Sequence, residues 1–295
     1  MVVLPASSLR QFEAFKCYNS PYAAHDDGSA IDLYPGTNRA PSPAAGEVVA
    51  VYRVRAPWQP YTREFDYVIG IDTAAGEEPL VDTATGAPSV ARILHVDPVV
   101  SVGDRVAVGD PLGVPVRAGF FAPWVANHLH VGFRRAGADL RRAGGSLPLD
   151  LEAGVTPYRW DGTGTVVRTG RTFVELAADL DPAAREADWV GVATDDGRVL
   201  DGGFPHYPYG GLIDRLTGGT DSVGTHEVSL LGSRVGEAVG RTVHWADTEV
   251  VANDTTVTGL SLFCARPAAF CVKLVCPDHN FAMGDDLGVT IRPIS

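Results

Sequence analysis

The feature that most limits the fold of this chain is a succession of short strand-like runs separated by turn-forming residues. In the N-terminal half, runs rich in Val, Ile, Tyr and Phe occupy residues 46–54, 65–72 and 90–96. Residues 99–113 form a β-turn-β pattern in which Gly103-Asp104 and Gly109-Asp110 supply the turns. Helical periodicity is scarce, so this half predicts antiparallel β-structure with short connections.

The C-terminal half continues the same pattern after a connector rich in Gly, Ala and Arg at residues 136–150. Strands are predicted at residues 162–168, 172–176, 189–194, 198–200, 226–231, 241–245, 256–264, 271–275 and 289–292. A chain of 295 residues, 45% of them apolar, is long enough to fill two cores. We therefore predict an all-β protein with two domains, residues 1–150 and 151–295, the second resembling a β-sandwich.

The charge and hydropathy of the chain exclude several classes of partner. A net charge of −12 argues against binding to nucleic acid or to anionic membrane surfaces. No apolar run approaches the length of about 18 residues that a membrane span requires. The first residues lack a basic region and a long apolar run, so we expect a cytoplasmic protein, or a secreted one whose leader this sequence does not include. The sequence carries no signal for an oligomeric state.

The basic residues are almost all arginine. Lys16 and Lys273 are the only lysines among 24 basic residues, and the chain is rich in Asp, Ala, Gly and Val. This acidic, lysine-poor composition resembles that of proteins from halophilic, high-GC microbes such as haloarchaea. A genome that is merely GC-biased is the alternative explanation.

A His-x-His pair lies on a predicted strand at residues 127–133. Residues i and i+2 of a strand point to the same face, so His128 and His130 project together. Two imidazoles on a rigid strand can supply a metal ligand and a group for acid–base chemistry or oxyanion stabilisation. Histidine pairs of this kind are also common in cores and on surfaces.

Two further segments carry residues of the same chemistry. His25 precedes a predicted loop and Asp32 lies on the strand after it, so both side chains could reach one ion. A histidine and a carboxylate together suit zinc; the alternative is a surface histidine and a capping aspartate. His95 is predicted on a strand, with Ile93 on the same face.

The order and spacing of these blocks resemble the lysostaphin-like zinc metallopeptidases, which include LytM-type and LasA-type enzymes. In that family a His and an Asp precede a β-rich core, and a His-Leu-His-Phe strand ends it. Here the resemblance covers roughly residues 20–135. It is carried by His25 and Asp32, by His95-Val96-Asp97 followed by Val102-Gly103-Asp104-Arg105-Val106-Ala107-Val108-Gly109, and by His128-Leu129-His130-Val131.

The resemblance implies a zinc-dependent endopeptidase. His25, Asp32 and His130 would be the zinc ligands, and His95 and His128 would be unliganded active-site histidines. Three protein ligands with a fourth position for water are typical of catalytic zinc. The implied substrate is an extended peptide in a groove, of the cell-wall type or otherwise rich in Gly and Ala.

The chain departs from the family in two respects. Six residues separate His25 from Asp32 instead of the commoner three, although LasA-type members tolerate a longer insertion. Asp26 or Asp27 is the alternative ligand, in a less natural position beside His25. Relatives mostly cleave peptide cross-links of bacterial cell walls outside the cell, so a cytoplasmic protein would need another substrate.

Two other functions are alternatives for the N-terminal half. Residues 102–113 also resemble the hairpin of biotinyl and lipoyl carrier domains, but no lysine lies between Lys16 and Lys273 to attach the cofactor. The remaining alternative is a non-catalytic module that keeps the peptidase fold and binds zinc, a peptide or a glycan.

The cysteines suggest a possible second zinc site. Cys264, Cys271, Cys276 and His279 lie close together in the sequence, but their spacing matches no established zinc motif. Cys264 and Cys271 fall in apolar strand segments, where a free cysteine behaves as a small hydrophobic residue. We therefore expect core cysteines or one disulfide in preference to a metal site.

Overall fold

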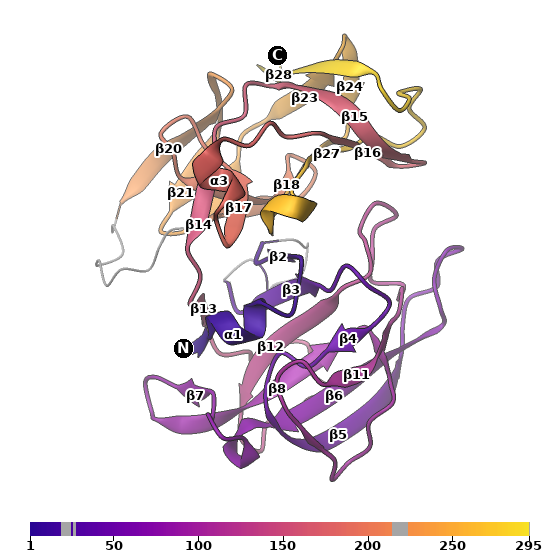
Figure 1. Ribbon diagram of the computed structural model, residues 1–295, viewed down its shortest axis with the longest axis vertical. Coiled ribbons are helices and arrows are strands. Elements are labelled where there is room, and N and C mark those ends of the chain that lie inside the picture. The colour runs from indigo at the N-terminus through magenta and orange to yellow at the C-terminus, as the bar shows by residue number, and fades with distance from the viewer. Residues whose placement is uncertain (19–24, 26–27, 214–223, 295) are drawn as a thin grey trace. The chain divides into compact units, whose positions relative to one another are not determined.

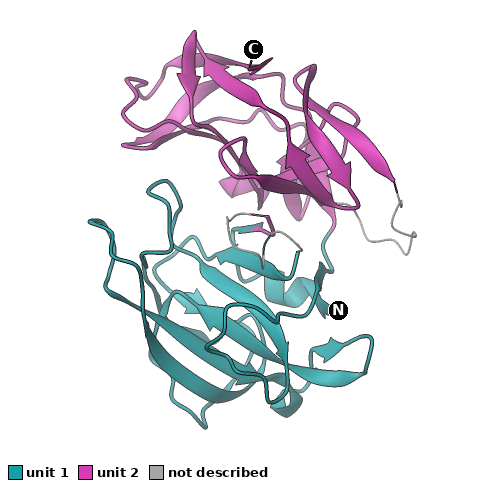
Figure 2. Ribbon diagram, turned by 180° about the vertical axis from the view of Figure 1, so that it is seen from behind, with its two compact units in different colours: residues 1–15, 23–153 teal, residues 16–22, 154–295 magenta. Residues whose placement is uncertain are grey.

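The chain folds into two compact units, seen in a computed structural model that describes residues 1–18, 25, 28–213 and 224–294. Unit 1 comprises Met1–Phe15 and Ala23–Ala153, and unit 2 comprises Lys16–Tyr22 and Gly154–Ser295 (Figure 2). The change from unit 1 to unit 2 after Ala153 lies close to the expected boundary at 150/151. The assignment of segment Lys16–Tyr22 to unit 2 was not predicted from the sequence.

Strands dominate both units, which confirms the prediction of an all-β protein. The described helices are short: α1 (Ala6–Leu9), α3 (Pro182–Arg185) and the 3-10 turns η1 (Thr73–Ala75) and η2 (Pro267–Ala269). No helix in the described part of the chain has the length and apolar character needed to cross a membrane.

The main sheet of unit 1 is antiparallel throughout and carries the candidate site. Its neighbouring strands are, in order, β10 (Arg105–Val106), β5 (Gly46–Arg55), β6 (Phe65–Asp72), β8 (Ala87–Leu94), β12 (Leu129–Arg135) and β3 (Ala30–Tyr34) (Figure 1). Smaller elements complete the unit: β1 (Val2–Leu4) with β13 (Leu149–Leu151), β2 (Ala14–Lys16), β7 (Val81–Asp82), and a sheet of β4 (Ala40–Pro41), β11 (Pro111–Pro115) and β9 (Val96–Pro98).

Alternation along β12 separates the core of unit 1 from the candidate site. Leu129, Val131 and Phe133 are fully buried on one face. Val131 is paired with Ile93 of β8 and with Ile31 of β3, which are also fully buried. His130 projects from the opposite face, so the strand that holds the histidine is anchored by the core behind it.

We expect Phe133→Ala to lower the free energy of unfolding by about 3–5 kcal/mol, because it removes a fully buried aromatic ring and leaves a cavity. Urea denaturation followed by circular dichroism measures the change. Val102→Ala, in an exposed turn of the same unit, is the control and should change stability by less than about 0.5 kcal/mol. Equal effects of the two substitutions would show that the β12 core does not stabilise the unit.

The segment predicted as a connector covers part of the sheet face that carries His130. Arg92 donates from Nε to the carbonyl oxygen of Leu140 at 2.6 Å. Arg134 is almost fully buried and donates to the carbonyl oxygens of Ala143 at 2.8 Å and of Gly144. Hydrogen bonds from the two arginines therefore hold residues 140–144 against the sheet, close to the strands that carry the candidate site.

Unit 2 contains one long antiparallel sheet that curls on itself. In order of neighbours its strands are β20 (Thr225–Leu230), β21 (Ser233–Val239), β22 (Thr242–Trp245), β19 (Tyr209–Ile213), β18 (Val199–Phe204), β25 (Gly259–Leu262), β27 (Val272–Val275), β16 (Phe173–Leu176), β15 (Thr163–Gly170), β28 (Asp286–Pro293), β23 (Thr248–Ala252) and β24 (Thr255–Val257). Ser233 Oγ of β21 donates to Ile291 O of β28 at 2.9 Å, although these strands are far apart in the sheet order. This contact between distant strands agrees with the predicted sandwich-like domain.

A smaller group of strands completes unit 2. β14 (Val155–Tyr158) runs parallel to β17 (Trp189–Val192), which pairs antiparallel with β26 (Cys264–Ala265). The prediction of a single strand at residues 256–264 is wrong, because these residues are divided among β24, β25 and β26. A positive φ of 147° at Gly259 marks the break before β25, a conformation that glycine adopts without steric cost.

Candidate metal centre

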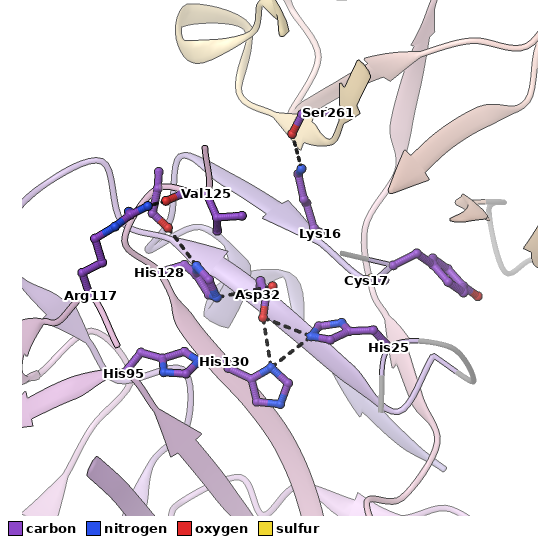
Figure 3. A network of polar contacts seen from close by, with 12 residues as sticks. Lys16, Cys17, His25, Asp32, His95, Arg117, Val125, His128, His130 and Ser261 are labelled. Carbon is purple, nitrogen blue, oxygen red and sulfur yellow. Dashed lines mark hydrogen bonds and ion pairs between the residues drawn. The ribbon is translucent and has the colours of Figure 1, made fainter. Parts of the chain in front are cut away.

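Asp32 and His130 are brought together by the register of two strands. They are direct partners across the antiparallel pair β3–β12, so their side chains lie on the same face of the sheet. His130 Nδ1 lies 3.0 Å from Asp32 Oδ1. The buried His25 reaches the same point from the preceding segment, with Nε2 3.3 Å from Asp32 Oδ1 and 3.0 Å from His130 Nδ1 (Figure 3).

The convergence of these three atoms fits a single metal ion. Zinc bonds of about 2.0–2.2 Å in a tetrahedral site would place the ligand atoms about 3.3–3.6 Å apart, and the observed separations lie at or slightly below that range. Two histidine nitrogens and one carboxylate oxygen are a donor set that zinc accepts. Within the described ranges, these three residues form a group of side chains that could hold a metal ion, with ligand atoms all within 4.8 Å of one another. The alternative ligands Asp26 and Asp27 lie outside the described residues.

The electrostatics of the cluster favour the protonation states that metal binding requires. Burial disfavours the charged form of Asp32 and by itself would raise its pKa. The adjacent His128 and His25 outweigh this effect and hold the pKa of the carboxyl well below its usual range. Burial lowers the pKa of His130 to about 4, although its contact with Asp32 acts in the opposite direction. At neutral pH the cluster therefore combines a carboxylate with a neutral imidazole, the forms that ligate a metal.

His128 lies beside this cluster and is held by its own contacts. Its Nδ1 donates to the carbonyl oxygen of Ala126 at 2.9 Å, and its Nε2 is 3.4 Å from Asp32 Oδ2. The ring stacks on Phe121 with a centroid distance of 4.4 Å and an interplanar angle of 15°. Burial lowers the pKa of His128 to about 4, so the ring is neutral near pH 7.

The prediction that His95 lies on a strand, on the same face as Ile93, is wrong. Strand β8 ends at Leu94, and His95 follows it with a left-handed φ of 69°. A regular strand would have directed His95 into the core beside Ile93. The left-handed conformation instead turns its ring toward the cluster, with centroids 5.2 Å from His128 and 6.0 Å from His130.

The structure adds residues that the sequence did not indicate. Asp66, fully buried on β6, lies against His95 with 2.6 Å between Oδ2 and Nδ1. Arg117 donates to the carbonyl oxygens of Val125 at 2.5 Å and Pro123 at 2.8 Å, which fixes the loop that carries Phe121. The partners of Asp66 and Arg117 depend on strand pairing and loop closure, so no local pattern marks these residues.

Within the part of the chain that the structure describes, the cysteines and His279 are not arranged as a second metal cluster. All four are free thiols, so the alternative of one disulfide is wrong. Burial raises the pKa of Cys271 to about 12 and that of Cys276 to about 11, and it raises the pKa of Cys264 still further above its usual value. His279 contacts the carbonyl oxygen of Gly170 at 2.7 Å. These thiols are therefore protonated at neutral pH, as expected of core cysteines.

The fold and the site together define a two-domain, all-β protein with a His–Asp–His cluster in its first unit. The chain belongs to the family described as DUF8155, a domain of unknown function. The model of its N-terminal domain matches residues 3–151, and that of its C-terminal domain matches residues 156–292. No curated protein and no solved structure matches the chain.

Proposed function

We propose that the protein is a zinc-dependent endopeptidase whose active site lies on unit 1. The observation that carries the proposal is the convergence of His25, Asp32 and His130, with two further histidines beside them. The resemblance of residues 20–135 to lysostaphin-like peptidases supports the same assignment. His25, Asp32 and His130 would hold the ion through Nε2, a carboxylate oxygen and Nδ1, respectively.

A zinc ion bound there would supply Lewis acidity, which polarises a carbonyl group and makes water more acidic. The side chains of His95 and His128 provide the remaining functions. One imidazole accepts a proton as the water oxygen attacks the peptide carbonyl carbon, and it delivers that proton to the amine nitrogen as the C–N bond breaks. The other accepts a hydrogen bond from the attacking water through its unprotonated ring nitrogen and so orients that water. The products are a carboxylate and an amine.

The proposed substrate is an extended peptide rich in Gly or Ala. Small side chains would allow its backbone to approach a site in which Asp32 and His128 are almost fully buried. The resemblance supports this substrate class, since lysostaphin-like enzymes act on bonds flanked by small residues.

The function is tested by incubating the full chain, with zinc supplied, with oligoglycine, oligoalanine and mixed Gly/Ala peptides. We expect cleavage that a chelator abolishes and that added zinc restores, measured by mass spectrometry of the products. Peptides rich in bulky side chains are the specificity control. Zinc binding and peptide binding without cleavage would contradict the peptidase proposal and favour a non-catalytic module.

A further inference from the structure

The carboxylate of Asp66 contacts both the ring and the backbone N–H of His95. Asp66 is fully buried at the start of β6. Its Oδ2 lies 2.6 Å from His95 Nδ1, and its Oδ1 accepts from the backbone N–H of His95 at 3.1 Å and of Tyr67 at 2.7 Å. One carboxylate thus holds both the ring and the backbone of the same histidine.

This double contact explains how His95 keeps its unusual backbone conformation. A left-handed conformation costs a residue with a side chain about 1–2 kcal/mol. The charge-assisted bond from the His95 N–H to Asp66 offsets that cost, and the second bond aligns the ring. Pairing of Val68 with Leu94 brings the start of β6 beside the end of β8, where the two residues meet.

The same contact determines which ring nitrogen of His95 carries the proton. An ionised carboxylate only accepts hydrogen bonds, so the proton lies on Nδ1 and the lone pair lies on Nε2. His128 differs, because its Nδ1 donates to a neutral backbone carbonyl. A carboxylate stabilises an imidazole that takes up a proton more strongly than a carbonyl does.

We propose that Asp66 is a positioning residue that fixes His95 with its proton on Nδ1 and presents Nε2 as the proton acceptor. The role in catalysis rests on the proposed endopeptidase function. His95 Nε2 would then receive the proton of the attacking water and pass it to the leaving amine nitrogen. Nε2 of His128, which also carries a lone pair because Nδ1 donates to Ala126, would accept a hydrogen bond from the attacking water and orient it.

The tautomer is tested without any activity measurement. Long-range proton–nitrogen spectra of the zinc-loaded protein, labelled with ¹⁵N-histidine, distinguish a protonated Nδ1 from a protonated Nε2. The His95 signals are assigned by their loss in His95→Gln. We expect Nδ1 of His95 to carry the proton. A proton on Nε2 in the wild-type protein would overturn the proposal, and this outcome does not depend on the folding of any Asp66 variant.

The variant Asp66→Asn tests whether the contact between Asp66 and His95 affects catalysis. The asparagine oxygen can still accept from the backbone N–H groups, whereas its NH₂ group donates to Nδ1 and forces the proton onto Nε2. We expect kcat to fall about 10–100-fold with KM and zinc content unchanged, as for partners that orient active-site histidines. Asp82→Asn, which changes another buried aspartate of unit 1, should leave kcat unchanged.

The double variant Asp66→Asn/His95→Ala decides whether Asp66 acts through His95. We expect it to be no slower than His95→Ala alone, because the residue that Asp66 positions is already absent. A further loss of the same size in the double variant would overturn the proposal. Absence of hydrolysis in the wild-type protein would refute the endopeptidase function, while the nitrogen spectra would still test the tautomer.

Discussion

His130→Ala should abolish zinc binding, and hydrolysis should be lost with it. The Nδ1 atom of His130 lies 3.0 Å from its counterpart on His25 and 3.0 Å from the carboxylate of Asp32, so its removal leaves two of three ligands. Catalytic zinc sites rely on three protein ligands, so we expect a site with only two of them to lose the ion during purification. Elemental analysis of protein purified without added metal should give one zinc per wild-type chain and none in the variant.

The matched control for His130→Ala is His244→Ala, which removes an exposed histidine from β22 of unit 2. It should keep the full zinc content. Zinc retained by His130→Ala would contradict the proposed ligand set. Two zinc ions in the wild type, falling to one in the variant, would require a second site and would revive the cysteine cluster. Wild-type protein that stays free of zinc when the metal is supplied would exclude the zinc enzyme.

Local periodicity was sufficient to predict the parts of the site that lie within strands. The alternation at residues 128–131 correctly placed Leu129 and Val131 in the core, with His130 on the opposite face. The start of the predicted strand at residue 127 is wrong, because β12 begins at Leu129 and His128 precedes it. Strand β3, which spans Ala30–Tyr34, carries Asp32 as predicted. The pairing of Asp32 with His130 depends on strand register, which residue patterns alone could not predict. The resemblance predicted only that both residues are ligands of one ion.

The conformation of His95 could not be predicted, because its cause is a tertiary contact. Nothing in the local sequence requires a positive φ at His95. This conformation is stabilised by the carboxylate of Asp66, which lies on β6, a strand that precedes β8 in the chain. The packing of residues 140–144 on the sheet was missed for the same reason. It depends on Arg92 and Arg134, whose acceptors are backbone carbonyls that leave no mark in the sequence.

His128→Ala should keep zinc and lose hydrolysis, and this separates catalysis from metal binding. The nearest approach of His128 to the ligand set is the 3.4 Å between its Nε2 and Asp32 Oδ2, and its Nδ1 is engaged by Ala126. Its removal therefore leaves the three convergent ligand atoms in place. Loss of a group that orients the attacking water or transfers its proton lowers kcat by about 10²–10⁴-fold.

The comparison of His128→Ala with His130→Ala controls for general damage to β12, because both substitutions truncate a histidine at the start of this strand, His128 just before it and His130 within it. Zinc content and peptide cleavage are measured on both variants, with circular dichroism to establish that each is folded. Hydrolysis retained by His128→Ala would remove this residue from the catalytic group. Zinc lost from His128→Ala would make it a ligand and require a different assignment of Asp32. Only a variant that holds zinc yet does not cleave shows that the second histidine of the pair binds the ion while the first acts on the substrate.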